Sequence, residues 1–309
     1  MVHRPLYSHS VIIALAACIL WSTAFAGIKI GLQYTTPLQF AGIRFMLSGL
    51  LILPFGRELK KNWQLLRVHY KSVFFISLFQ TIILYTFFYL GISKTPAAVA
   101  AIIVGGGPLF VALLAHFITG QDHLTIRKSI ALLIGFSGII LLALAKDKSG
   151  NGYNAVLLGI FLLVTGNFAG SYGNILVSKH KTGISPVFLN AVQIFFGGLI
   201  ILIISLFFEA PDFSVKPLPY YLSLAWLSML SAAAFTLWFV VLNRPEVKVS
   251  EINVWKFIIP VLGAVLSWLV VAGEKPQWNT IAGMLLIASS IVIIYYRGIL
   301  KFFKGPGRG

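Results

Sequence analysis

The feature that most constrains this chain is a series of long apolar runs separated by short polar breaks. A helix needs about 20 apolar residues to cross a hydrocarbon core of roughly 30 Å. In lipid only a helix satisfies its own backbone polar groups segment by segment, so each run predicts a transmembrane helix. We expect an all-α integral membrane protein with ten spans, at 11–31, 38–56, 72–92, 96–119, 128–145, 153–178, 185–208, 219–242, 250–272 and 278–297.

The charge of the chain fits this interpretation. Charged residues make up only 10% of the chain, against roughly 25% in a soluble domain, and the mean hydropathy is +0.91. A formal net charge of +16 would indicate a nucleic-acid partner in a soluble protein. Here the basic residues lie mainly in the breaks between spans, which is a pattern of membrane topology, so we expect no nucleic-acid partner.

The distribution of Lys and Arg predicts the orientation. The breaks on one side hold six, namely Lys29, Lys94, Lys146, Lys148, Lys216 and Lys275. The breaks and ends on the other side hold sixteen, namely Arg4, Arg57, Lys60, Lys61, Arg67, Lys71, Arg127, Lys128, Lys179, Lys181, Arg244, Lys248, Arg297, Lys301, Lys304 and Arg308. Basic residues concentrate in cytoplasmic loops. We therefore expect a multi-pass protein of the inner (plasma) membrane with both termini in the cytoplasm.

The two halves of the chain resemble each other. Thr36-Pro37 at the start of span 2 corresponds to Ser185-Pro186 at the start of span 7. At the same offset, Arg44 corresponds to Gln193 and Gly49 to Gly198. We expect a first repeat at 1–147 and a second at 148–309, the latter with a short basic cytoplasmic tail. Because each repeat has five spans, the second must insert upside down relative to the first, which is a transporter design.

Several motifs then resemble a known family. They are Trp21-Ser22-Thr23, the stretch from Pro37 to Arg44, Pro108 with Gly120-Gln121-Asp122, the Gly135 and Gly138 pair, and Pro260 with Gly273-Glu274. In this order they resemble the drug/metabolite transporter superfamily, EamA type, over nearly the whole length. That family usually has glycine–glutamate after span 4, where this chain has Gly120-Gln121-Asp122. The resemblance implies a ten-helix metabolite exporter or permease with a central cavity, without fixing the substrate.

Polar residues inside the spans are the candidates for a binding site. A charge at the bilayer centre costs about 3 kcal/mol unless it faces protein or water. Lys256 lies inside span 9 and shares a helical face with Asn253 and Pro260. Lys256 either meets an anionic group of the substrate, or reaches the cytoplasmic interface or pairs with Glu251.

Further candidates come from other spans. Span 6 offers Asn167 and Ser171, which share a face with Asn174 and either line the cavity or join helices. Aromatic residues able to stack on a substrate, or simply typical of membrane helices, are Trp21, Tyr85 and Trp238. We assign structural or gating roles to Arg44, Pro108, Pro260 and Gly106.

These observations favour one function. We expect a secondary transporter, an exporter of small polar metabolites such as amino acids, that works by alternating access through a central cavity. A channel or a non-transporting membrane scaffold stays open as an alternative, as does an intramembrane enzyme. The chain has no His-Glu-x-x-His, no Gly-x-Ser-x-Gly and no clustered metal ligands. We therefore expect no enzyme activity, no cofactor and no metal, and partners limited to a small-molecule substrate and the lipid bilayer. The sequence leaves the oligomeric state open.

Overall fold

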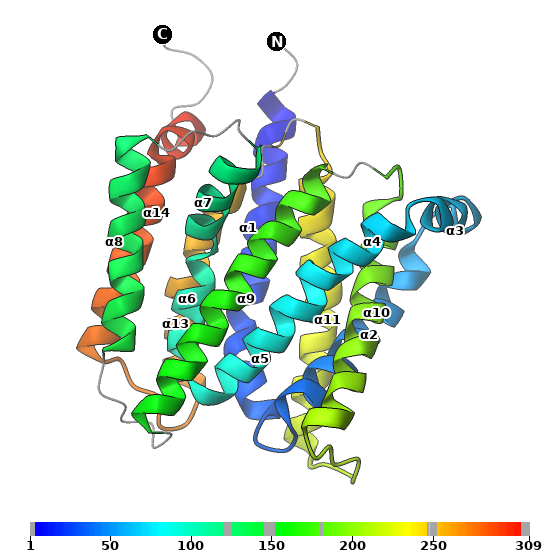
Figure 1. Cartoon of the computed structure of the whole chain (residues 1–309), viewed down its shortest axis with the longest axis horizontal. Helices are drawn as coiled ribbons and strands as arrows, with labels where there is room; N and C mark the ends of the chain where they lie inside the picture. Colours follow the sequence, from blue (N-terminus) through cyan, green and yellow to red (C-terminus); the bar gives the residue numbers. More distant parts are fainter. Residues whose placement is uncertain are drawn as a thin grey trace.

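The computed structural model describes residues 4–119, 125–144, 152–179, 182–245, 247 and 252–303, and all regular elements within them are helical. The first half contains α1 (Arg4–Gly31), α2 (Pro37–Ile52), η1 (Leu53–Phe55), α3 (Leu59–Val68), α4 (Tyr70–Ser77), η2 (Leu78–Ile83), α5 (Leu84–Lys94), α6 (Ala97–Gly105), α7 (Gly107–Thr119) and α8 (Ile126–Ala143). The second half contains α9 (Tyr153–Lys179), α10 (Pro186–Phe208), α11 (Leu218–Leu242), η3 (Asn253–Phe257), α13 (Ile258–Val270) and α14 (Trp278–Phe303). Figure 1 shows them packed as one bundle.

The predicted spans are confirmed. In the described residues, 8 helical segments are long and apolar enough to cross a membrane. Two shorter apolar helices, Trp255–Val270 and Trp278–Ile294, occupy the positions of spans 9 and 10. The boundaries differ from the expected ones by a few residues, because hydropathy does not resolve the last turn of a helix. The expected division between residues 147 and 148 lies outside the described residues.

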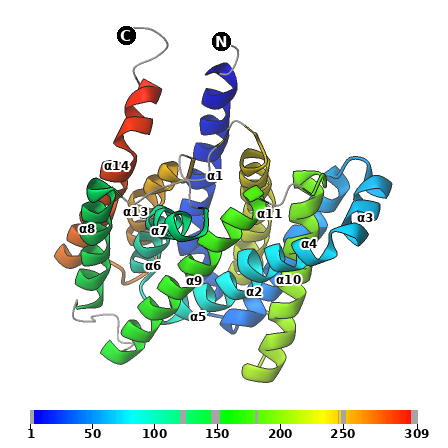
Figure 2. The same ribbon diagram turned by 45° about the horizontal axis from the view of Figure 1, so that its top comes forward.

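The bundle has the internal relationship expected of inverted repeats. The second spans of the two halves, α2 and α10, pack against each other. The fourth spans, α6 and α13, do the same, and so do the fifth spans, α8 and α14. The first span of each half packs against the third span of the other, α1 on α11 and α9 on α5. In Figure 1, α1 runs downward from the N-terminus and α9 runs upward. Figure 2 shows α8 and α14 at one edge, and α10 at the opposite edge near α3.

Apart from span 2, which ends in the 3-10 turn η1, three spans are not continuous α-helices in the described part of the chain. Span 3 contains a π-helical segment, η2, between α4 and α5. Span 4 breaks at Gly106, between α6 and α7. Span 9 begins as the 3-10 helix η3, and Pro260 lies in the first turn of α13, where it cannot donate a hydrogen bond to the carbonyl of Lys256. Broken helices are tolerated at membrane depth where they line a cavity.

Carboxylates of the second half bind helix N-termini of the first. Glu209, just after α10, accepts hydrogen bonds from the backbone N–H groups of Leu38 and Gln39 at 2.9 and 3.1 Å. Glu274, just after α13, accepts them from Ala97 and Ala98 at 2.5 and 3.1 Å. The first N–H groups of a helix have no partner within the helix and carry partial positive charge. Both carboxylates therefore fix one half against the other on the side away from the termini.

The loop expected at 57–71 contains a helix that hydropathy alone did not indicate. This helix, α3, is amphipathic and too polar to count as a span. Asn62 is its buried anchor, since Oδ1 accepts a hydrogen bond from the backbone N–H of Ser185 at 2.9 Å. The same side chain donates to the carbonyl of Arg57 at 2.7 Å.

Candidate functional site

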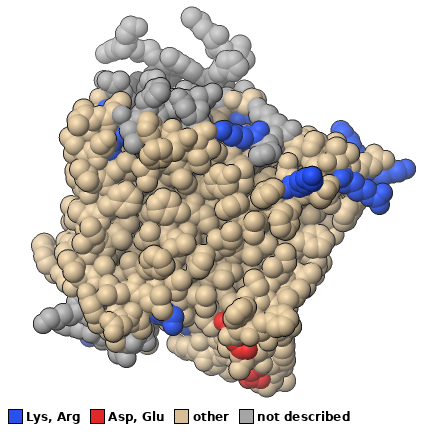
Figure 3. Space-filling model, viewed as in Figure 1, with Lys and Arg blue, Asp and Glu red and all other residues tan. Residues whose placement is uncertain are grey.

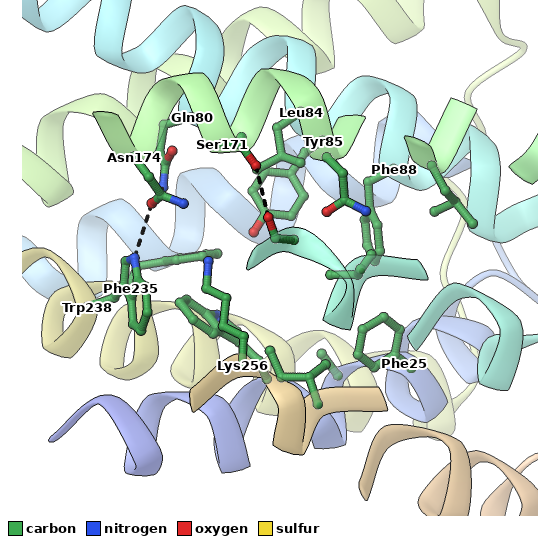
Figure 4. Close-up of a pocket in the computed structure, with 18 of the residues that line it drawn as sticks. Phe25, Gln80, Leu84, Tyr85, Phe88, Ser171, Asn174, Phe235, Trp238 and Lys256 are labelled. Atoms are coloured by element: carbon green, nitrogen blue, oxygen red, sulfur yellow. Dashed lines mark hydrogen bonds between the residues drawn. The ribbon is translucent and has the colours of Figure 1, made fainter. Parts of the chain in front are cut away.

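A cavity of about 100 Å³ lies in the middle of the bundle (Figure 4). Its walls come from both halves, chiefly from α1, η2 and α5 on one hand and from α9, α11 and η3 on the other. Six of the seven predicted substrate-binding residues line it, namely Trp21, Tyr85, Asn167, Ser171, Trp238 and Lys256. The structure thus gathers residues from spans 1, 3, 6, 8 and 9 around one space.

Lys256 carries the most distinctive chemistry of this cavity. Its side chain rises from η3 toward α11 in Figure 4. The ammonium nitrogen lies 4.4 Å from the ring centroid of Trp238 and 5.5 Å from that of Trp21. An ammonium over an indole face is stabilised by about 2 kcal/mol when water is excluded. This placement differs from snorkelling to the interface, and the alternative partner Glu251 lies outside the described residues.

The aromatic residues form a continuous wall beside Lys256. The rings of Trp21 and Trp238 lie 5.3 Å apart, and Trp21 also contacts Phe235 at 5.4 Å. Tyr85 lies against Phe235 at 5.8 Å. Tilted contacts of this kind are favourable for aromatic pairs. The rings therefore present one aromatic surface beside the ammonium of Lys256.

The polar residues of α9 both line the cavity and join helices. The side-chain amide of Asn167 donates to the carbonyl of Ile103 at 2.8 Å, and the hydroxyl of Ser171 donates to that of Gly107 at 3.4 Å. The Asn174 carbonyl oxygen accepts from the indole N–H of Trp238 at 3.1 Å and from the amide of Gln80 at 3.2 Å. Thus α9 is tied to span 4 beside its break, and to spans 3 and 8.

Glycines allow α9 to approach span 3 this closely. A Cβ at Gly166 would lie 3.0 Å from the carbonyl oxygen of Leu84. At Gly170 it would lie 2.9 Å from the Leu84 side chain, and at Gly173 it would overlap Gln80. Small residues at such contacts are typical of membrane helix packing.

Arg44 also reaches the cavity wall, but its donors are engaged. It is 2% exposed. Its Nε and Nη2 donate to the hydroxyl oxygen of Ser231 at 3.0 and 2.7 Å, and its Nη1 donates to that of Tyr89 at 2.6 Å. Gln193, its counterpart in the second half, is likewise engaged by span 3, through the hydroxyl of Thr81 at 2.6 Å. Arg44 thus joins span 2 to spans 3 and 8, and Gln193 joins span 7 to span 3.

The remaining predicted residues lie near the cavity rather than on its surface. Asn253 is completely buried and does not line the cavity, whereas Lys256 of the same 3-10 helix does. Gly106 is the residue at which span 4 breaks, and Pro108 follows in the first turn of α7. Pro260 packs on Gly105, so the irregular segments of spans 4 and 9 touch.

The apolar part of the cavity was not predicted. Phe25, Phe88 and Phe235 line it, as do Ile28 and Leu163. Apolar residues facing a cavity have the same composition as residues facing lipid, so no sequence signal separates them. Gln80 and Asn174 carried a signal, because a polar amide inside a span is unusual.

Comparison with known proteins places the chain in a family. The EamA-like transporter family matches residues 9–144 and 157–296. The uncharacterized transporter YvbV of Bacillus subtilis is 25% identical over 281 residues, covering 89% of this chain and 88% of that protein. The uncharacterized inner membrane transporter YedA of Escherichia coli is 23% identical over 288 residues, covering 90% and 89%. A WAT1-related chloroplastic protein of Arabidopsis thaliana is 27% identical over 199 residues, covering 63% of this chain and 46% of that protein.

The fold has also been seen in a crystal. A solved structure titled only as the crystal structure of a protein superposes with a TM-score of 0.69 at 18% identity. The superposition covers 97% of this chain and 99% of the chain in that structure. The family match extends over both halves of the chain and agrees with the helices that enclose the cavity. The chain belongs to the EamA-like transporter family and is a multi-pass membrane transporter.

Proposed function

We propose that the chain is a secondary transporter that exports a small metabolite with a carboxylate or similar anionic group, such as an amino acid or an organic acid. It works by alternating access through the central cavity. The observation that carries this proposal is the ammonium of Lys256 inside the cavity, in contact with two indole faces. Among the described residues that line the cavity, none is Asp or Glu. An anionic group of the substrate would supply the missing countercharge.

The walls support a substrate with both polar and apolar parts. In Figure 4, Lys256, Trp238, Asn174 and Gln80 lie toward one end, and Phe25 and Phe88 toward the other. A small polar metabolite loses water on entry and needs replacement hydrogen bonds. Side chains at the first end can provide them, while the phenyl rings contact the apolar part.

The mechanism follows from the inverted halves. Two repeats of opposite orientation allow one chain to adopt two mirror-related openings around a fixed site. The breaks in spans 4 and 9 adjoin the cavity through Gly107 and Lys256, so a change at these breaks would alter its shape. We place both termini in the cytoplasm, because α3, with its exposed basic side chains, lies toward the side where α1 begins (Figure 1). Export is the direction suggested by the family resemblance.

Counterflow in proteoliposomes tests the transport proposal. Vesicles loaded with unlabelled amino acids or organic acids should accumulate the labelled substrate in a saturable manner. Lys256→Met keeps the side-chain length but removes the charge, and it should raise the substrate KM at least tenfold. Lys275→Met, which removes an exposed charge on the outer side, is the matched control. If Lys256→Met folds normally and transports an anionic substrate with unchanged KM, Lys256 does not bind substrate. Conductance without saturation would instead indicate a channel.

A further inference from the structure

A second cleft lies away from the central cavity, between α4 and α9. Its volume is about 340 Å³. Lys71, Ser72 and Phe75 of α4 form one wall, and Tyr172 and Leu176 of α9 form the other. None of these five residues lines the central cavity, so the cleft is a separate feature.

The cleft changes in polarity with depth. Lys71 and Ser72 lie in the first turn of α4, where the span begins, and Phe75 follows one turn further into the span. On the opposite wall, Leu176 lies near the end of α9 and Tyr172 one turn further in. A polar entrance beside the membrane surface followed by apolar walls matches a phospholipid, whose charged headgroup leads to acyl chains.

A basic segment adjoins the entrance. It consists of five exposed side chains between η1 and the first turn of α4, namely Arg57, Lys60, Lys61, Arg67 and Lys71. The one acidic residue between them, Glu58, pairs with Lys61 at 2.8 Å. Figure 3 shows blue side chains projecting at the upper right, where α3 lies in Figure 1, and the red side chains visible in this view lie at the bottom. The segment therefore favours an anionic partner.

The helix α3 presents this charge at the membrane surface. Its buried face holds Asn62, with Leu65 and Leu66 half-buried, while Lys60 and Arg67 lie on the exposed face. Trp63 is 45% exposed on the same helix. Basic amphipathic helices with an aromatic residue lie in the plane of the interface and bind anionic lipids. Asn62 fixes α3 to the start of α10, so the charges are held beside the cleft.

We propose that the cleft between α4 and α9, together with the basic segment, is a binding site for an anionic phospholipid. The phosphate lies at Lys71 and Ser72 within the field of the basic segment, and an acyl chain runs along Phe75 and Leu176. Each basic residue near an anionic membrane surface contributes about 1 kcal/mol, or roughly a fivefold change in affinity.

The site adjoins the transport machinery without overlapping it. Ser171 lines the central cavity and its neighbour Tyr172 lines the cleft, so both surfaces belong to one stretch of α9. Tyr172 also contacts Phe79 of η2, with ring centroids 4.6 Å apart. A lipid in the cleft would therefore stabilise the contact between α4, η2 and α9, whatever the substrate.

Lipid titration of the purified protein tests this proposal. Phosphatidylglycerol and phosphatidylcholine are added to the detergent-solubilised protein, and retained lipid is counted by native mass spectrometry while the Tm is followed. Phosphatidylglycerol should raise the Tm and remain bound, whereas phosphatidylcholine should do neither. Lys71→Gln should raise the phosphatidylglycerol concentration at half-saturation about fivefold. Ser72→Trp, which fills the cleft without changing charge, should abolish lipid retention. Lys275→Gln, an exposed charge on the far side, is the control.

Two results would overturn the site. One is that Lys71→Gln or Ser72→Trp responds to phosphatidylglycerol as Lys275→Gln does. The other is that soluble glycerol phosphate raises the Tm as well as phosphatidylglycerol does, which would identify a phosphate site without a lipid. All three substituted side chains are partly or fully exposed, so each variant should fold. A variant that elutes as an aggregate in size exclusion is replaced by Lys71→Ala or Ser72→Phe, to which the same criteria apply.

Discussion

Two nitrogens of the Arg44 guanidinium donate to the hydroxyl oxygen of Ser231, at 3.0 and 2.7 Å. This bond joins α2 to α11 beside the cavity. A buried donor on a charged group that loses its acceptor costs about 1.5 to 3 kcal/mol. Ser231→Ala should therefore lower the free energy of unfolding by about that amount, measured as a lower Tm in detergent. Met229→Ala, which shortens an exposed side chain on the same helix, is the control. An unchanged Tm for Ser231→Ala would show that the bond contributes nothing to stability.

The second prediction concerns the cap that Glu274 forms on the N-terminus of α6. Glu274→Ala removes both acceptors of the Ala97 and Ala98 N–H groups. Loss of a helix N-cap costs about 1 to 2 kcal/mol, so the Tm should fall. Glu274→Gln should have a smaller effect, because one oxygen acceptor remains. Glu58→Gln is the control, since its pair with Lys61 is exposed and such pairs contribute little. Equal Tm values for Glu274→Ala and the control would contradict the capping role.

The loop between α10 and α11 should respond to acid. The ammonium of Lys216 donates to the Asp212 carboxylate, as do the backbone N–H and hydroxyl of Ser214, and together they lower the Asp212 pKa from 3.8 to about 2. Because the Asp212 pKa is lower in the folded loop than in the unfolded chain, the ionised carboxylate stabilises the loop at pH values above 3.8. This stabilisation is lost as the pH falls through about 2. Amide exchange at Ser214 should therefore accelerate as the pH falls below 3.8, relative to its intrinsic rate. Asp212→Asn should exchange fast already at neutral pH, and slow exchange in that variant would refute the assignment.

The positions of the spans could be predicted from sequence for a simple reason. Lipid permits only helices with satisfied backbones, so the apolar runs and their breaks fix the helices directly. The inverted arrangement followed from an odd number of spans in each half. The helix α3 and the π segment η2 could not be predicted, because they depend on contacts such as that of Asn62 with Ser185 and of Gln80 with Asn174.

The candidate site was predictable only in its polar part. Lys256, Asn167 and Ser171 are conspicuous because polar groups inside a membrane need a reason. Asn253 was assigned by α-helical spacing, yet this segment is a 3-10 helix in which Asn253 is completely buried and does not line the cavity. Phe25 and Phe88 face the cavity rather than lipid only because of how α1 and α5 are rotated in the bundle. That rotation is set by packing across the whole protein.

Orientation in the membrane remains a prediction, and labelling tests it. On a Cys18→Ser background, single cysteines replace Lys61 in α3 and Lys275 after α13, both exposed. An impermeant maleimide added to intact cells should label only the Lys275→Cys protein, because we place α3 in the cytoplasm. Permeabilised cells, in which both should react, are the control. Labelling of Lys61→Cys from outside would reverse the assigned topology.

Substitutions at two adjacent glycines in span 4, Gly105 and Gly106, test its packing and its gating separately. A Cβ at Gly105 would overlap Cδ of Pro260, where spans 4 and 9 touch. Overpacking of this kind costs about 1 to 3 kcal/mol, so Gly105→Ala should lower the Tm. A Cβ at Gly106 would lie 3.0 Å from the Ile103 carbonyl oxygen, a close contact that a shift of a few tenths of an ångström relieves, and the φ of −70° at Gly106 suits any residue. Gly106→Ala should therefore lower the Tm less than Gly105→Ala does.

The same pair tests the hinge assigned to Gly106. The helix breaks at this residue, and a side chain there would restrict the change in φ and ψ that gating requires. Gly106→Ala should lower the maximal rate of counterflow while leaving substrate KM close to normal, because the cavity lining is untouched. Gly105→Ala is the comparison variant, because its loss of transport should be proportional to its loss of folded protein. A Gly106→Ala protein that folds and exchanges substrate at the full rate would place the moving element elsewhere, with the break at Gly106 serving only to bring Gly107 to the cavity.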